Sequence, residues 1–179
     1  MKLNKNLMRV LFLHYSYLIN IAHGITDLMP PIIRFLIFKL VLKQMGKNVF
    51  IDTKVYFRYP HKVSIGNGVS VNRGCEFYPS FYHKDAVIIL GNNIRIGPGV
   101  KFLAAGHDHT KLNLPDTAGR IEIKNNVWIG ANCSILQGVT IEEGAIIAAG
   151  SVVSKNALKY KIYGGIPAKE IKDRVITEP

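Results

Sequence analysis

Aliphatic and aromatic residues recur every six positions over most of the chain after residue 44. Four residues after many of them stands a second small or branched apolar residue, such as Val49 or Val69. A period of six fits neither an amphipathic helix nor simple strand alternation, and is typical of a parallel β-helix in which three hexads make one triangular coil. The hexad positions form four runs in register: Met45, Ile51, Phe57; Ile65, Val71, Phe77; Leu90, Ile96, Phe102; and Ile123, Ile129, Ile135, Ile141, Ile147, Val153.

The spacing has a direct physical meaning. Each short strand points one apolar side chain into the prism, where it stacks on its equivalents in coils about 4.8 Å away. The corners turn tightly and need Gly, Asn or Asp, as in the stretches IGNGV, LGNNI and IGPGV. With about eighteen residues per coil, the sequence predicts about five coils over residues 45–158, between an N-terminal leader (1–44) and a C-terminal tail (159–179).

The regular spacing fails at two places. A short excursion separates Phe77 from Leu90, and twenty-one residues separate Phe102 from Ile123 where six would keep the register. A long loop in so economical a scaffold is usually functional. We therefore expect an extended loop over residues 103–122, thrown out from a corner of the prism, and this loop carries His107, Asp108 and His109.

The leader is apolar but interrupted by polar residues. Residues 10–26 hold no Asp, Glu, Lys or Arg, yet they include His14, Asn20 and His23, which makes them a poor membrane span. No small-residue cleavage site of a signal peptide follows. A second short helix is expected to begin at the prolines at 30 and 31 and to end at Gly46. We expect the leader to cap the first coils; peripheral membrane contact is the alternative.

Composition and charge narrow the function classes. The chain has 179 residues and a net charge of +11, from 23 basic and 12 acidic residues. This excess suits an anionic partner, but the basic residues are scattered and accompany no nucleic-acid-binding motif, so no nucleic acid is expected. The only cysteines, Cys75 and Cys133, fall at hexad positions that need small buried side chains. They are interpreted as core thiols of a reducing, cytoplasmic compartment.

The stretch NVWIGANCSILQGVTIEEGAIIAAGSVVSK, followed by YGGIPAKEIK, resembles the C-terminal half of the hexapeptide-repeat acyltransferases. The likeness covers roughly residues 45–172 and is greatest to the sugar O-acetyltransferases that modify maltose, galactosides, nodulation factors or polysaccharides. It implies an all-β fold, a left-handed parallel β-helix, whose hand the spacing alone does not give. It also implies a homotrimer with acetyl-CoA bound between adjacent prisms, and no metal. The leader resembles that of polysaccharide-decorating members.

The resemblance assigns candidate catalytic residues. His107 stands where the family has its catalytic histidine, and a neutral imidazole is a suitable general base near neutral pH; His109 is the alternative. Asp108 is expected to orient the ring, although a solvated loop aspartate is an equal reading. Asn72 matches the family asparagine across the cleft, near the acceptor hydroxyl and the thioester, and a purely structural corner asparagine is the alternative.

The resemblance also assigns the contacts to the acyl donor. Ala131 would offer a backbone N–H to the oxyanion, and Ala149 would line the pantetheine channel. Tight corners favour small residues too, which leaves a structural reading of both alanines. Trp128 is expected to pack at a subunit seam. The remaining expected donor contacts are Ser154, Lys155, Lys169 and Lys172.

The expected function is therefore acetyl-CoA-dependent O-acetylation of a sugar hydroxyl in surface polysaccharide biosynthesis, in the cytoplasm or at the inner face of the membrane. Three alternatives stay open: N-acetylation of a nucleotide-linked amino sugar, a carbonic-anhydrase-like metal enzyme, and a non-catalytic scaffold. The metal enzyme is disfavoured because that family's two histidines five residues apart are absent; His107 and His109 are two apart. The sequence does not identify the acceptor sugar.

Overall fold

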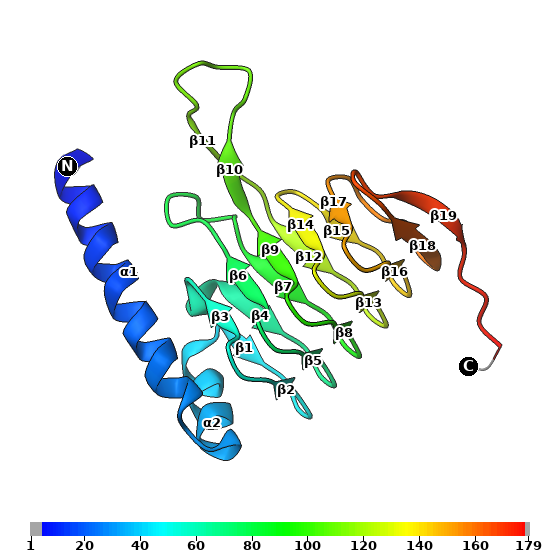
Figure 1. Cartoon of the computed structure of the whole chain (residues 1–179), viewed down its shortest axis with the longest axis horizontal. Helices are drawn as coiled ribbons and strands as arrows, with labels where there is room; N and C mark the ends of the chain where they lie inside the picture. The colour runs from blue at the N-terminus through cyan, green and yellow to red at the C-terminus, as the bar shows by residue number, and fades with distance from the viewer. Residues whose placement is uncertain (1–4, 178–179) are drawn as a thin grey trace.

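The computed structural model describes residues 5–177, which form a left-handed parallel β-helix preceded by two α-helices (Figure 1). Three parallel sheets make the faces of a triangular prism, and each coil contributes one short strand to each sheet. The coils are β1–β3, β4–β6, β7–β9, β12–β14 and β15–β17. The predicted fold, with about five coils and an extended loop, is confirmed.

The strands are two or three residues long in the coils. The first sheet holds β1 (Gln44–Met45), β4 (Val63–Ile65), β7 (Ile88–Leu90), β12 (Ile121–Ile123) and β15 (Thr140–Ile141). The second holds β2 (Phe50–Ile51), β5 (Ser70–Val71), β8 (Arg95–Ile96), β13 (Trp128–Ile129) and β16 (Ile146–Ile147), and is extended by β18 (Lys161–Gly164) and β19 (Lys169–Asp173). The third holds β3 (Tyr56–Phe57), β6 (Glu76–Tyr78), β9 (Lys101–Leu103), β14 (Ser134–Leu136) and β17 (Val152–Val153).

The hexad residues form the core of the prism. Ile65, Leu90 and Ile123 are in register in successive strands of the first sheet, and all three are buried. In the third sheet, Phe57, Phe77 and Phe102 are fully buried, and their rings stack with centroid separations of 4.7 and 4.6 Å. Cys75 and Cys133 are buried free thiols, as expected, and burial raises the pKa of the Cys75 thiol to about 11.

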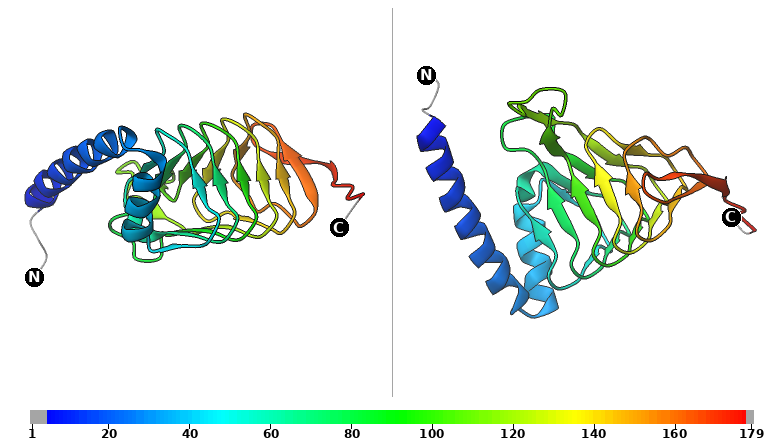
Figure 2. Two further views of the ribbon diagram at one scale, coloured as in Figure 1. Left: turned by 90° about the horizontal axis from the view of Figure 1, so that it is seen from below. Right: turned by 45° about the horizontal axis from the view of Figure 1, so that its top comes forward.

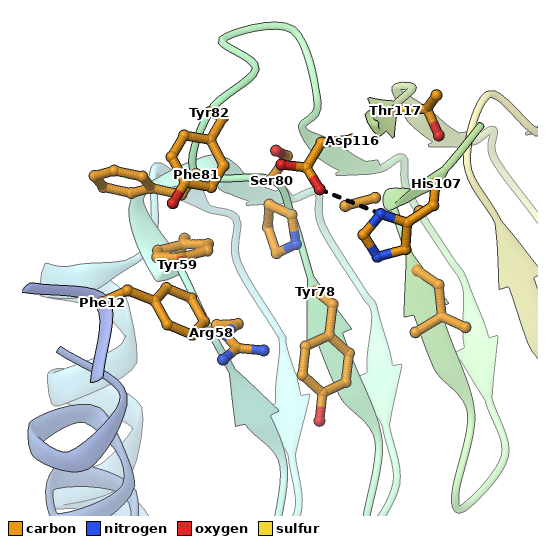
Figure 3. Close-up of a pocket in the computed structure, with 14 residues that line it drawn as sticks. Phe12, Arg58, Tyr59, Tyr78, Ser80, Phe81, Tyr82, His107, Asp116 and Thr117 are labelled. Carbon is orange, nitrogen blue, oxygen red and sulfur yellow. Dashed lines mark ion pairs between the residues drawn. The ribbon is translucent and has the colours of Figure 1, made fainter. Parts of the chain in front are cut away.

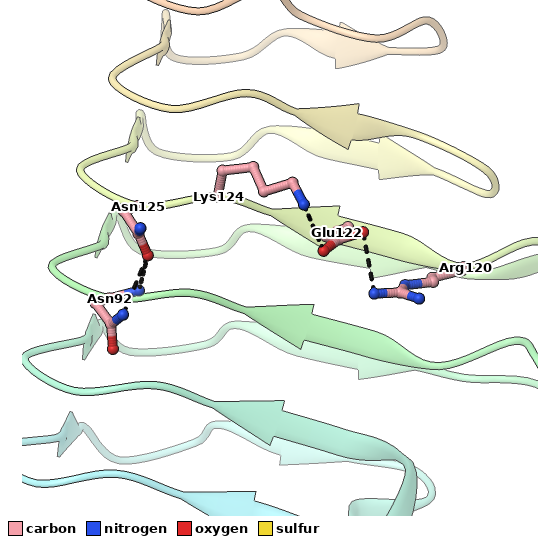
Figure 4. Close-up of polar contacts among 5 residues, drawn as sticks. All are labelled: Asn92, Arg120, Glu122, Lys124 and Asn125. Atoms are coloured by element: carbon pink, nitrogen blue, oxygen red, sulfur yellow. Dashed lines mark hydrogen bonds and ion pairs between the residues drawn. The ribbon is translucent and has the colours of Figure 1, made fainter.

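Repeated polar contacts hold the corners between coils. The backbone N–H of Asn92 donates to Asn125 Oδ1 at 2.8 Å (Figure 4). The N–H of Asn67 donates to Asn92 Oδ1 at the same distance. Beside this ladder, Glu122 pairs with Arg120 and Lys124. A Cβ built on Gly91 would lie 2.7 Å from Asn125 Oδ1, so this corner leaves no room for a larger residue.

Helix α2 (Pro31–Val41) covers the end of the prism where the first coil lies (Figure 2). Phe38 and Leu42 join the core, and the Phe38 ring packs edge-on against Phe57 at 5.3 Å. The buried Arg34 donates to the carbonyl oxygens of Ile51 and Asp52. The helix was expected to reach Gly46 but ends at Val41, because β1 pairs with β4 immediately afterwards.

Helix α1 (Lys5–Asp27) runs alongside this end of the prism and projects beyond it (Figure 1). It is attached by polar groups: Tyr15 O–H donates to the Arg58 carbonyl at 2.6 Å, and Asp27 Oδ1 accepts the Lys54 N–H at 2.8 Å. His23 Nε2 lies 3.2 Å from the backbone nitrogen of Phe57. No helix among residues 5–177 combines the length and the apolar character needed to cross a membrane.

Candidate active site

The loop between β9 and β12 is a β-hairpin that stands out from the prism. Its strands, β10 (Ala105–His107) and β11 (Asp116–Ala118), are antiparallel, and His107 is in register with Asp116. The Gln137 side chain of the next coil donates to Thr117 Oγ1 at 2.9 Å. The hairpin base is therefore fixed to the rigid coils, while residues 108–115 form its tip.

Two acceptors lie near Nδ1 of His107. The carbonyl oxygen of Leu114 is 3.1 Å from it and Asp116 Oδ1 is 3.3 Å from it. Leu114 has φ = 43°, a left-handed conformation that is uncommon for a leucine, and this backbone turn presents its carbonyl to the ring. With both neighbours accepting, the proton of the neutral ring belongs on Nδ1, which leaves Nε2 free to take up a proton.

His107 lies at the edge of a pocket of about 340 Å³ (Figure 3). The hairpin forms one side, the excursion after β6 a second, and α1 contributes Phe12 to a third. The lining combines aromatic rings with a few polar groups, a composition typical of small-molecule sites. Besides His107 and Phe12, the main lining side chains are Arg58, Tyr59, Tyr78, Ser80, Phe81, Tyr82, Asp116 and Thr117.

Arg58 is the cation of this pocket. Its guanidinium carbon lies 4.7 Å from the ring centroid of Phe12 and 5.8 Å from that of Tyr78. Within residues 5–177, its Nε is buried and has no hydrogen-bond partner. Arg58 and Tyr78 also line a second pocket, of about 500 Å³, together with Ser16 and Asn20 of α1. The two pockets therefore adjoin along the space between α1 and the third sheet.

Tyr78 is held by the carboxylate of Glu76, to which its hydroxyl donates at 2.5 Å. Burial and this carboxylate raise the pKa of Tyr78 well above its usual value. Tyr78 is consequently a neutral phenol at physiological pH, able to pack against a ligand or accept a hydrogen bond from it, but not to act as a base.

The structure places Asp108 away from the His107 ring. Its carboxylate accepts the backbone N–H and the hydroxyl of Thr110, at 3.0 and 2.6 Å, and lies 3.4 Å from the ammonium of Lys111. These hydrogen bonds lower the pKa of Asp108. The carboxylate brought to His107 is that of Asp116 instead. His109 is exposed beside Asp108.

Three other predicted residues share the corner between the second and third sheets. Asn72 follows β5 and donates through Nδ2 to the Ile96 carbonyl at 2.7 Å. Ala131 follows β13 and Ala149 follows β16; the Gly150 N–H donates to the Ala131 carbonyl at 2.8 Å, joining these coils. His107 lies instead beyond the third sheet, at its corner with the first. A single chain thus places Asn72, Ala131 and Ala149 on a different corner from His107.

The remaining predicted contacts lie towards the C-terminal end of the prism. Ser154 and Lys155 are exposed just after β17, and Lys169 and Lys172 are exposed on β19, which forms an antiparallel hairpin with β18. Trp128 is 53% exposed on the flank of the prism. Among residues 5–177, no three His, Cys, Asp or Glu side chains gather closely enough to hold a metal ion.

Sequence reasoning missed three residues of this site. Asp116 stands in an aperiodic stretch, and only the β10–β11 pairing brings it to His107. Phe12 and Arg58 are more than forty residues apart and meet because α1 crosses the third sheet. The one available signal was Arg58 itself, a charged residue directly after a hexad position of the first coil.

Residues 120–155 match the protein family described as bacterial transferase hexapeptide (six repeats). The chain is 32% identical over 143 residues to galactoside O-acetyltransferase of Escherichia coli K12, covering 76% of this chain and 66% of that one. It is 37% identical over 129 residues to a protein of Lysinibacillus sphaericus assigned as a macrolide acetyltransferase, covering 58% and 71%. A third relative, at 28% identity with 81% and 77% covered, is an E. coli K12 acetyltransferase assigned to colanic acid biosynthesis.

Among solved structures, a galactoside acetyltransferase in complex with coenzyme A superimposes with a TM-score of 0.79 at 25% identity, covering 92% of this chain and 82% of that one. The hexad repeats and these relatives define the class as acetyltransferases built on a parallel β-helix. The chain belongs to the hexapeptide-repeat acetyltransferases. The matched part of the chain covers 66%, 58% and 53% of the lengths of the first three curated relatives, which is between about half and two thirds of each.

Proposed function

We propose that this protein is an acetyl-CoA-dependent O-acetyltransferase that modifies a sugar hydroxyl, with His107 as the general base. The observation that carries the proposal is the state of the His107 ring: the Leu114 carbonyl and Asp116 hold Nδ1, and the ring borders an aromatic pocket. A fixed neutral imidazole with a free Nε2 is what deprotonation of an alcohol requires.

The reaction follows from this geometry. Nε2 of His107 removes the hydroxyl proton as the sugar oxygen attacks the carbonyl carbon of the thioester. The tetrahedral oxyanion is stabilised by a backbone N–H, for which Ala131 is the candidate. Its collapse breaks the carbon–sulfur bond, and the proton on His107 passes to the departing coenzyme A sulfur. The products are an O-acetyl sugar and coenzyme A.

A homotrimer would complete this site. His107 and the candidate donor residues lie on different corners of one prism, so one chain alone does not bring Asn72 or Ala131 to the imidazole. Adjacent prisms of a trimer would set one chain's His107 against the other corner of its neighbour. The exposed Trp128 supports a covered flank, and Lys155, Lys169 and Lys172 supply positive charge for the phosphates of the donor.

The pocket beside His107 suits a carbohydrate acceptor. The rings of Tyr59, Phe81 and Phe12 offer flat apolar surfaces for the C–H faces of a sugar, and Arg58 and Ser80 offer polar contacts. A role in surface polysaccharide biosynthesis is supported by the relative assigned to colanic acid biosynthesis. The use of acetyl-CoA supports action on the cytoplasmic side of the membrane.

Purified full-length protein should release coenzyme A from acetyl-CoA when a panel of oligosaccharides is supplied, and mass spectrometry should find an acetyl ester on one of them. Replacing His107 with Ala should lower turnover by about 10²–10⁴-fold, the usual contribution of a general base, while calorimetry shows unchanged acetyl-CoA binding. His109→Ala, two residues away on the same hairpin, is the matched control and should retain activity. Near-normal turnover of His107→Ala would falsify the assignment, and so would a loss of activity in His109→Ala while His107→Ala stays active. An alkali-stable amide product would instead indicate N-acetylation.

A further inference from the structure

The side of helix α1 that faces the β-helix is mixed: Phe12 contacts Arg58, Tyr15 stacks on Tyr59, and polar residues lie beside them. Ser16, Asn20, His23 and Asp27 recur at helical spacing, and all four face the β-helix: the first two line the second pocket, His23 meets the Phe57 backbone, and Asp27 caps the Lys54 N–H. A helix docked on a soluble core normally turns its most apolar side inwards. Within residues 5–177, the opposite side of α1, which carries most of its large aliphatic residues, is instead largely exposed.

The outer face of α1 and of the turn after it carries an apolar stripe, defined here by Leu7, Leu11, Leu18, Ile21, Ile25 and Leu28 and interrupted by the exposed His14. Each of these side chains is between 42% and 83% exposed. The stripe is about 32 Å long at 1.5 Å per residue. An exposed apolar surface of this extent marks an interaction site. Helix α2 adds further exposed apolar residues, including Ile32, Leu36 and Leu40.

The charges around the outer face select its partner. Lys39, Lys43 and Lys47 are exposed on or next to α2, and the only carboxylate in residues 7–51 is that of Asp27, which accepts the Lys54 N–H. A basic rim around an apolar face complements an anionic lipid surface. Two copies of the same face would bring like charges together, and the stripe is wider than a coiled-coil seam because Val10, Leu13 and Tyr17 are exposed beside it.

We propose that the outer face of α1 lies in the interface of an anionic membrane, with the helix parallel to the surface and the basic residues at the level of the headgroups. The inner face then keeps its contacts with the β-helix. Docking does not rest on the proposed transferase activity. If both hold, the pocket that Phe12 lines is brought beside the bilayer, where a lipid-carried glycan would present its sugar.

Flotation of the full-length protein with vesicles tests this without acetyl-CoA or acceptor. The protein should float with phosphatidylcholine vesicles containing phosphatidylglycerol and much less with phosphatidylcholine alone. The variant Leu18→Gln/Ile25→Gln should lower the partition coefficient by at least about tenfold. Lys39→Gln/Lys43→Gln should reduce mainly the preference for anionic vesicles. Leu158→Gln/Ile176→Gln is the matched control, because these side chains have similar exposure but lie at the opposite end of the chain, and it should float like the parent.

Three results would overturn the proposal. The first is failure of the parent protein to float with anionic vesicles, and the second is flotation of Leu18→Gln/Ile25→Gln to the same extent as the parent. The third is a parent protein that does not bind vesicles and forms an assembly that, by light scattering, is lost in Leu18→Gln/Ile25→Gln. The partner of the outer face would then be a second copy of the chain. Circular dichroism of each variant checks that the helices are retained, so that loss of binding is not loss of folding.

Discussion

Replacing Asp116 with Asn should lower kcat/KM by less than about tenfold, although Asp116 is the carboxylate nearest His107. The two groups are 3.3 Å apart, but their side chains are 58% and 60% exposed. Once His107 has taken up the substrate proton, its Coulomb energy with the Asp116 carboxylate at that distance in water is about 1.3 kcal/mol, and exposed ion pairs contribute about 0–1 kcal/mol in practice. Since about 1.4 kcal/mol corresponds to a tenfold change in rate, loss of this interaction should lower the rate by less than about tenfold. The Leu114 carbonyl, which also holds Nδ1, is unaffected by the substitution.

The assay is the initial rate of coenzyme A release at low and high ionic strength. If Asp116 acts on the protonated His107 only as a solvent-exposed charge, salt should, at saturating acetyl-CoA, lower the parent rate towards that of Asp116→Asn and affect the variant less. His107→Ala, assayed in parallel, gives the full loss expected when the base itself is removed. A loss of a thousandfold or more in Asp116→Asn would refute the reasoning, because a carboxylate with that effect must be shielded from water in the active assembly.

Two further predictions concern stability. Phe77→Ala removes a fully buried ring stacked on both sides, so the free energy of unfolding measured in urea should fall by about 5 kcal/mol. The control Phe81→Ala removes a ring that is 53% exposed and should change this free energy by less than about 1 kcal/mol. A fall below about 2 kcal/mol for Phe77→Ala would argue against a continuous stack. Burial lowers the pKa of His23, so the folded protein binds fewer protons than the unfolded chain, and stability should fall as the pH drops below about 6.5. Urea titrations at pH 7.5 and 5.5 should show a smaller fall for His23→Gln than for the parent, and equal falls would contradict this role.

The coils could be predicted from the sequence because the same core position recurs in every coil. Ile65, Leu90 and Ile123 occupy equivalent positions in successive coils, so many hexads independently indicate the same strand and register. The surroundings of His107 have no such redundancy. The φ of Leu114 and the register of Asp116 depend on one hairpin, whose pairing no pattern announces. Helix α1 could not be placed from the sequence for another reason: its pattern does not say which side meets the β-helix, and only the contacts of Phe12, Tyr15 and His23 identify that side.

The stacking of coils along one axis makes this scaffold tolerant of change at its edges. Each coil contacts its immediate neighbours, so a segment inserted at a corner leaves the register of the other coils intact, as the excursion after β6 and the β10–β11 hairpin demonstrate. The walls of the pocket beside His107 come largely from such insertions and from the appended α1. Exchange of such short non-repetitive segments would therefore reshape the pocket beside His107 without disturbing the hexads that determine folding.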